Sequence, residues 1–160
     1  MKHKIEYLGV LGLLAGFVVL AGAGLLQSAS PDKVTGGVSF STTTNGGEEL
    51  RRWVEFEAHA VLDNSAKGWI KYHNSNGLRF RADVQCLSVV DEWAYFSGPI
   101  VAASDTLLLT RWFLFVVYDG GTPGSKGDKI FYQLHYTDPG CSPFQPPVIY
   151  DVDEGNLVVH

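Results

Sequence analysis

Two stretches of this sequence alternate strictly between apolar and polar side chains, and this pattern constrains the fold more than any other feature. Within Arg52–Leu62 one side of the pattern is apolar and consists of Val54, Phe56, Ala58, Ala60 and Leu62. Within Leu78–Leu87 the apolar side consists of Leu78, Phe80, Ala82, Val84 and Cys86. A period of two residues is typical of a strand with one buried face and one solvated face. The pattern therefore predicts a half-buried β-sheet.

Similar strand-like runs follow one another along the chain, separated by turn residues. Asn76-Gly77 is the strongest hairpin signal, because both residues tolerate a positive φ. Asp138–Pro147 holds four prolines and is expected to be irregular, and no helix is expected after residue 32. The segments expected to form strands are Lys33–Ser41, Arg52–Leu62, Gly68–His73, Leu78–Leu87, Trp93–Phe96, Leu109–Asp119, Lys129–Tyr136 and Asn156–His160.

These runs predict an all-β domain, an antiparallel meander of about eight strands. A barrel is preferred over a sandwich, because an open sheet of this length would leave aggregation-prone edges. Closure of the barrel requires the strand around Val34–Phe40 to pair with Asn156–His160.

Composition excludes other classes of protein. Aromatic residues make up 12% of the 160 residues, charged residues 18%, and there are 18 glycines. Disordered chains have few aromatics and a high net charge, and helical bundles are rich in Ala, Glu, Lys and Leu. The net charge is −5, so a phosphate backbone repels the chain and nucleic acid is not expected as a partner.

The N-terminus has the layout of a secretory signal peptide. Lys2 and Lys4 precede an uncharged apolar run from Tyr7 to Leu26, and Ala21-Gly22-Ala23 supplies small residues for cleavage before Gly24. The alternative is an uncleaved anchor, since 20 helical residues span about 30 Å. We therefore expect a signal peptide at 1–23, a linker at 24–32 and one β-domain at 33–160. The domain is expected to be secreted or held in the cell envelope, and to meet a membrane only through this segment if it is uncleaved.

Because the domain is expected to be exported, the number of its cysteines bears on whether they form a disulfide. The chain has two cysteines, Cys86 and Cys141, and both lie in the exported part. An even number in an oxidising compartment favours one disulfide, and the alternative is a pair of free thiols. No Cys-x-x-Cys spacing points to a metal site.

The two ends of the predicted domain carry recognisable motifs. Lys33–Gly37 reads KVTGG and Gly155–His160 reads GNLVVH. A looser middle motif consists of Val117, Asp119, Gly121, Pro123, Gly124, Gly127, Asp128 and Phe131. The chain from Lys33 to His160 resembles the post-COAP-type domains, a family of small secreted bacterial β-domains, although Val38 replaces a third glycine and a Pro-rich insertion precedes Tyr150. The resemblance implies a fold and a compartment, and no established activity.

Acid–base chemistry is one hypothesis for the polar strand face. If turns at Asn64 and Asn76 set the register, Glu57 lies across from His73 and then Arg79, and His59 lies near Lys71 and Arg81. A carboxylate beside an imidazole can transfer protons, so Glu57, His73 and Arg79 are the catalytic candidates. Cross-strand charge pairs are equally typical of a solvated sheet face.

Binding is the other hypothesis for the same face. Trp53, Trp69, His59 and Lys71 are the binding candidates, because a mixed aromatic and polar strip can stack sugar rings or receive a protein. Tryptophans packed in the core or at a barrel rim are the alternative.

A calcium site is a further hypothesis for the glycine-rich turn Asp119–Asp128. Asp119 and Asp128 flank it and are candidate calcium ligands, although two carboxylates are few and the segment also fits an ordinary turn. It lacks the Lys-Ser/Thr pair and following helix of a phosphate-binding loop. No cofactor is expected.

Three functions follow as hypotheses. The preferred one is a non-catalytic secreted or cell-envelope domain that binds a glycan or a protein surface. The alternatives are a small secreted β-barrel enzyme and a carrier of a small apolar ligand, which needs an internal cavity of at least ~300 Å³.

Overall fold

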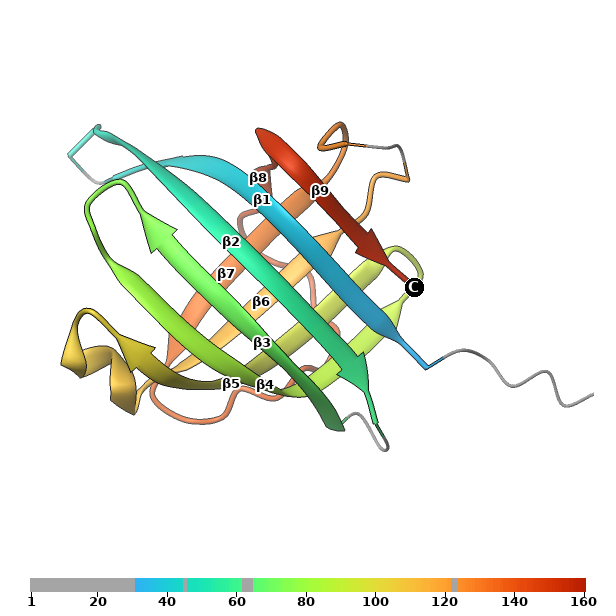
Figure 1. Cartoon of the computed structure of the whole chain (residues 1–160). Helices are drawn as coiled ribbons and strands as arrows, with labels where there is room; N and C mark the ends of the chain where they lie inside the picture. The colour runs from blue at the N-terminus through green and yellow to red at the C-terminus, as the bar shows by residue number, and fades with distance from the viewer. Residues whose placement is uncertain (1–30, 45, 62–64, 122–123) are drawn as a thin grey trace, which may run out of the picture.

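The structure is a computed structural model that describes residues 31–44, 46–61, 65–121 and 124–160. Within these ranges nine strands form one antiparallel sheet (Figure 1). The strands are β1 (Lys33–Thr43), β2 (Glu49–Ala60), β3 (Ser65–Asn74), β4 (Arg79–Val90), β5 (Trp93–Ala103), β6 (Trp112–Tyr118), β7 (Lys129–His135), β8 (Tyr150–Asp151) and β9 (Glu154–Val159). The predicted signal peptide and most of the predicted linker lie outside the described residues. Within the described ranges no helix has the length and apolar character needed to cross a membrane.

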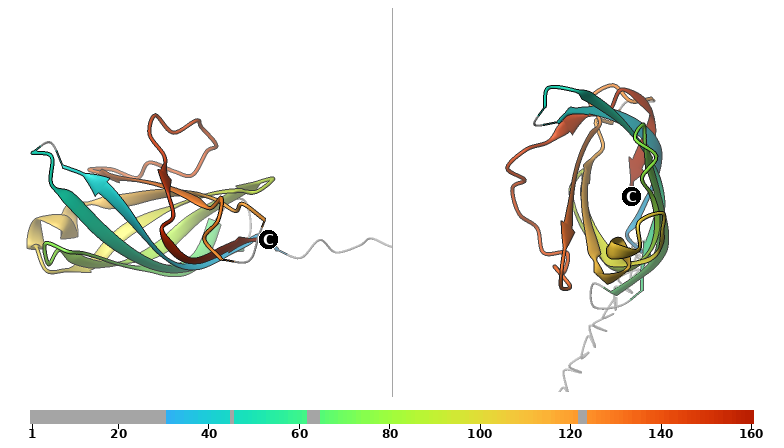
Figure 2. Two further views of the ribbon diagram at one scale, coloured as in Figure 1. Left: turned by 90° about the horizontal axis from the view of Figure 1, so that it is seen from above. Right: turned by 90° about the vertical axis from the view of Figure 1, so that its left-hand side faces the viewer.

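The sheet curls into a half-barrel whose first strand meets its last. The spatial order is β8-β7-β6-β5-β4-β3-β2-β1-β9, so β1 to β8 form a meander and β9 joins at the side of β1 (Figure 2). The register pairs Val34 with Val159 and Ser39 with Glu154. The all-β prediction and the expected pairing of the first and last strands are therefore confirmed.

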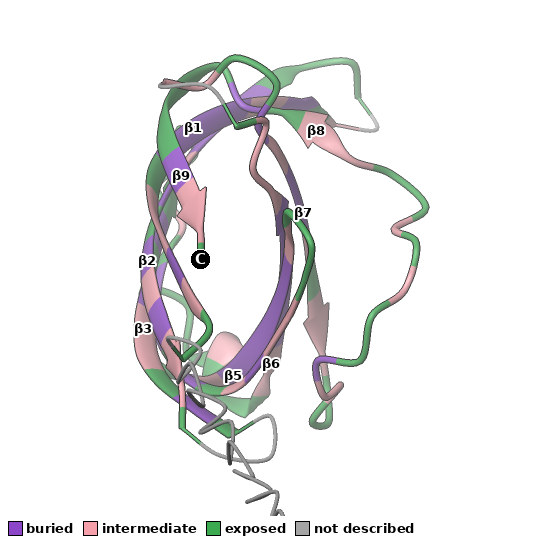
Figure 3. Cartoon of the chain, turned by 90° about the vertical axis from the view of Figure 1, so that its right-hand side faces the viewer, coloured by how far each residue is buried: buried purple, intermediate pink, exposed green. Residues whose placement is uncertain are grey.

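The inner face of the half-barrel is filled by the sheet's own side chains. The largest fully buried side chains include those of Phe40, Phe56, Phe96, Phe113 and Phe115. Buried residues alternate with more exposed ones along β2 and β3, whereas β5 and β6 each have five consecutive buried residues (Figure 3). The Phe56 and Phe96 ring centroids are 5.2 Å apart, and those of Phe96 and Phe115 are 6.0 Å apart. Aromatic rings at such distances attract each other, and this attraction stabilises the fold in addition to the burial of the rings. The alternation that predicted one buried face is confirmed in β2 and, as far as Val84, in β4.

One expected orientation is wrong, that of Cys86. Val84 and Leu87 are both buried in the main core, so the alternation of β4 changes phase between them. The change coincides with an irregularity in the pairing of β4 with β5, between Ala82 and Cys86. A bulge adds one residue to a strand and turns the following side chains to the other face. Cys86 therefore points to the outer face.

The predicted disulfide joins Cys86 to Cys141, with 5.8 Å between their Cα atoms. A second, smaller apolar cluster surrounds the bridge on the outer face and consists of Tyr95, Val116, Phe131 and Cys141, with Cys86, Trp93 and Phe144 packed against them. The disulfide thus ties the Pro-rich excursion to the outside of β4, and the cluster packs it against β5, β6 and β7. Closing a loop of this length stabilises the fold by about 4 kcal/mol in the chain-entropy model.

Several element boundaries also differ from expectation, and β5 runs to Ala103 where the expected strand ends at Phe96. The strand expected to start at Leu109 begins at Trp112, because Thr106–Thr110 forms a 3-10 helix. Asp105 caps this helix, since its side chain accepts the Leu107 N–H. The ninth strand, β8, has only two residues and follows the Pro-rich stretch, where no strand was expected.

Two aspartates hold the free edge of β9. One edge of this strand pairs with β1, and on the other edge the Leu157 and Val159 N–H groups point away from β1. The Leu157 N–H donates to Asp128 Oδ2 at 3.3 Å, and the Val159 N–H donates to Asp119 Oδ2 at 3.0 Å. Asp128 is 1% exposed, and its Oδ1 accepts the Gly120 N–H at 2.9 Å. The two carboxylates thus accept the hydrogen bonds that a neighbouring strand would accept in the interior of a sheet.

The buried carboxylate makes a testable contribution to stability. We expect Asp128→Asn to lower the free energy of unfolding by about 1.5–3 kcal/mol, because the amide replaces one oxygen with a donor that faces backbone N–H groups. Urea denaturation followed by tryptophan fluorescence measures this change. The control is Asp138→Asn, because the exposed Asp138 carboxylate accepts only the Gly140 N–H of its own turn. Equal stability of the two variants would contradict the role of Asp128 in holding β9.

Candidate functional site

The polar candidates lie together on the outer face of β1 to β4. Trp53 of β2 pairs with Ser39 of β1 and His73 of β3, and His73 pairs in turn with Arg79 of β4. The next row along the strands pairs Glu55 with Lys71. The structure therefore confirms that Trp53, Trp69, Glu55, Lys71 and His73 share the face opposite the core.

The predicted register between β2 and β3 is wrong. Glu57 pairs with Trp69, and His73 lies four positions further along β3, so the expected catalytic row of Glu57, His73 and Arg79 does not form. His59 pairs with Lys67 instead of lying near Lys71. The β3–β4 part of the prediction holds, because His73 does pair with Arg79. A slip by an even number of residues leaves every side chain on its original face, so alternation could not detect the error.

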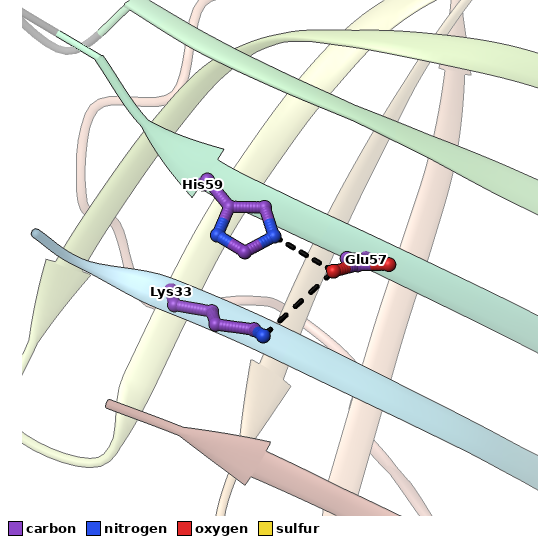
Figure 4. Close-up of polar contacts among 3 residues, drawn as sticks. All are labelled: Lys33, Glu57 and His59. Atoms are coloured by element: carbon purple, nitrogen blue, oxygen red, sulfur yellow. Dashed lines mark hydrogen bonds and ion pairs between the residues drawn. The ribbon is translucent and has the colours of Figure 1, made fainter.

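Glu57 instead contacts a residue of its own strand. The ring N–H of His59 at Nε2 donates to Glu57 Oε1 at 2.7 Å, and Lys33 Nζ lies 3.7 Å from the same oxygen (Figure 4). The hydrogen bond from His59 lowers the pKa of Glu57, and the nearby Lys33 charge lowers it further. The Glu57 and His59 side chains remain 40% and 43% exposed. This cluster is a solvated polar contact at one end of the face.

The pKa of Glu57 provides a test of that contact. We expect His59→Ala to raise the pKa of Glu57 toward the ordinary glutamate value, because the carboxylate loses its strongest partner. Lys33→Ala should raise it less, since the lysine is the weaker cause. A lowered pKa means that the ionised form is favoured, so the contact is complete at neutral pH and is lost as the pH falls through that pKa. Carbon-13 NMR titration of the carboxyl group measures the value, and an unchanged pKa in His59→Ala would refute the assignment.

At the other end of the face a hollow surrounds Trp53. The Trp53 and His73 rings are stacked with centroids 4.8 Å apart and planes inclined by 9°. The hollow has a volume of about 320 Å³, and it is lined by Gly37, Val38, Ser39, Trp53, Val54, Glu55, His73, Glu154 and Gly155. It therefore combines an aromatic wall with two carboxylates and a hydroxyl group.

Ion pairs hold the polar groups around this hollow. Arg51 Nη2 lies 2.7 Å from Glu154 Oε2 and donates to Ser39 Oγ at 3.2 Å, with its guanidinium 5.4 Å from the Trp53 ring centroid. Lys71 Nζ lies 3.7 Å from Glu55 Oε2. Both carboxylates keep further lone pairs available, because an ionised carboxylate accepts about four hydrogen bonds.

Two glycines keep the floor of the hollow open. A Cβ atom on Gly37 would meet no other atom within 4 Å, so the missing side chain leaves free space. Gly155 has a φ of 110°, and a Cβ there would collide with the Gly37 carbonyl. The KVTGG and GNLVVH motifs therefore meet where β9 pairs with β1, next to the hollow. Sequence reasoning did not connect Ser39, Glu154 and these glycines with Trp53.

The second tryptophan of the face lies outside the hollow. Lys71 Nζ lies 4.9 Å from the Trp69 ring centroid, in the position of a cation–π contact. Trp69 therefore shares the face with Trp53 and is engaged by a side chain of its own strand. Of the four binding candidates, Trp53 is the one that lines the hollow; Trp69, His59 and Lys71 do not line it.

The calcium candidates Asp119 and Asp128 are engaged by backbone N–H groups at the β9 edge. Among the described residues no group of three or more His, Cys, Asp or Glu side chains is placed to hold a metal ion.

We compared the chain with protein-family models, curated proteins and solved structures, and no match was found in any of the three. The function is therefore inferred from the site itself.

Proposed function

We propose that this chain is a non-catalytic secreted or cell-envelope β-domain that binds a neutral glycan at the Trp53 hollow. The observation that carries the proposal is the stacked Trp53–His73 pair beside the carboxylates of Glu55 and Glu154. A sugar ring presents an apolar C–H face that packs on an aromatic ring, and hydroxyl groups that donate to carboxylates. Binding sites of this kind combine apolar contact with a few placed polar groups.

The shape of the site supports a surface glycan over a small enclosed ligand. The hollow is shallow and lies on the outside of four paired strands, where a long chain can cross without threading into the protein. Strands hold the lining side chains in fixed positions, so little ordering is needed on binding. The Cys86–Cys141 disulfide supports the exported location, because disulfides persist in oxidising compartments. The resemblance to post-COAP-type domains is consistent with the same location.

The test compares two tryptophans of one face. We expect the full chain to bind at least one member of a panel of neutral polysaccharides, and Trp53→Ala to weaken binding of that member about tenfold or more, because a central aromatic contact is lost. Isothermal titration calorimetry measures both affinities. Trp69→Ala is the matched control and should bind as the unaltered chain does, since Trp69 does not line the hollow.

Three results would overturn the proposal. One is the absence of binding across the panel, and another is equal affinity of Trp53→Ala and the unaltered chain. The third is the release of new reducing ends from the bound polysaccharide, which would favour the enzyme hypothesis. Loss of that release in Glu57→Gln would then assign the activity to Glu57.

A further inference from the structure

The inner face of β2 carries a buried cation. Arg52 is 8% exposed, and its position in β2 turns it toward the interior, between the inward-facing Leu50 and Val54. Its Nη1 donates to the Leu50 carbonyl at 3.0 Å and to the Thr42 hydroxyl. The guanidinium lies 5.2 Å from the centroid of the Tyr132 ring. The group thus lies inside the half-barrel, near the end formed by the β1–β2 hairpin (Figure 1).

No negative charge compensates this guanidinium in the described part of the chain. Arg52 takes part in no ion pair there, and its buried Nε has no hydrogen-bond partner. Burial raises the pKa of Tyr72 and of Tyr132, so both phenols stay neutral at physiological pH and do not supply a charge. An unpaired buried charge is costly, and buried arginines are normally paired with an anion.

The surroundings of Arg52 are rich in hydrogen-bond donors. Tyr132 contacts Tyr72 and Tyr150, with ring centroids 6.1 Å and 6.5 Å apart. Asn74 pairs with Arg52 across the β2–β3 ladder and is also buried. Phenol and threonine hydroxyls and the asparagine amide can all donate to an anion.

A hollow opens next to this cluster. It has a volume of about 440 Å³ and is lined by Ser41, Thr42, Thr43, Gly47, Glu49 and Tyr150. Thr42 connects the two regions, because it lines the hollow and its hydroxyl accepts from Arg52. Tyr150 connects them as well, through its contact with Tyr132. Glu49 is an exposed carboxylate of this wall and does not pair with Arg52.

We propose that Arg52 is the anchor of an oxyanion site, in which a carboxylate or phosphate group enters through the hollow at Thr42 and Tyr150 and pairs with the buried guanidinium. The planar fork of the guanidinium matches the two oxygens of such a group. The site lies on the opposite face of the sheet from the Trp53 hollow and does not depend on glycan binding.

The experiment follows the Arg52 side chain directly. NMR spectra of the full chain, labelled with nitrogen-15 arginine, are recorded during titration with sodium phosphate, acetate or octanoate at constant ionic strength against sodium chloride. We expect a saturable shift of the Arg52 Nε–H resonance with at least one oxyanion. A phosphate response identifies a phosphate-type headgroup, and a carboxylate response that is stronger for octanoate than for acetate identifies a carboxylate with an apolar tail. No shift with any of the three anions would overturn the proposal.

Variants separate binding from a structural role. We expect Arg52→Met to abolish the anion-dependent rise in melting temperature and to retain or increase the melting temperature without anion, because an unpaired charge is replaced by an apolar side chain of similar length. Arg52→Lys keeps the positive charge but lacks the planar guanidinium that can bind both oxygens of the anion. The Kd for the anion should therefore rise about tenfold or more. If Arg52→Met does not fold, the lysine variant provides the test.

The adjacent residue supplies the matched control. Arg51→Met removes the same charge from the outer face, where Arg51 pairs with Glu154, and should leave anion binding unchanged. Equal loss of binding in Arg51→Met, or full binding in Arg52→Lys, would assign the effect to net charge alone and overturn the site.

Discussion

The attachment of β9 is the constraint on which the rest of this structure depends. One edge of the strand pairs with β1, and its other edge donates N–H groups to the carboxylates of Asp119 and Asp128. An exposed strand edge is a template for aggregation, and charge-assisted hydrogen bonds from two aspartates occupy it here. The same attachment brings Glu154 and Gly155 to the side of Ser39, so the geometry of the Trp53 hollow depends on it as well.

Both proposed sites lie on one strand, and the pleat of that strand separates them. Arg52 and Trp53 are neighbours in the chain, and alternate side chains of a strand point to opposite faces. Arg52 therefore lies inside the half-barrel among tyrosines, while Trp53 lies outside against His73. The disulfide and the apolar cluster around it lie on the outside of β4 to β7, whereas the Trp53 hollow is lined by residues of β1, β2, β3 and β9.

The local pattern was sufficient for the two faces of β2 and for the meander of the consecutive strands. Alternation assigned Val54, Phe56 and Ala58 to the core and Trp53 and Glu55 to the outside, because the period of a strand is a local property of the chain. The end motifs and the problem of open edges led to the pairing of the first and last strands. The even cysteine count led to the disulfide, although the bulge in β4 turned Cys86 to the face opposite to the expected one.

The sequence by itself determined which residues of β2 face the core, that the described part of the chain is all-β, and that its first and last strands pair. Only the tertiary structure decided the β2–β3 register, which places Trp69 opposite Glu57, and the β1–β9 register, which places Glu154 opposite Ser39 and completes the Trp53 hollow. It also decided that Arg52 is buried without a carboxylate partner in the described chain. The physical reason is that a slip of two or four residues leaves the polarity of each face unchanged, so register and closure are set by turns, bulges and edge contacts between residues far apart in the sequence.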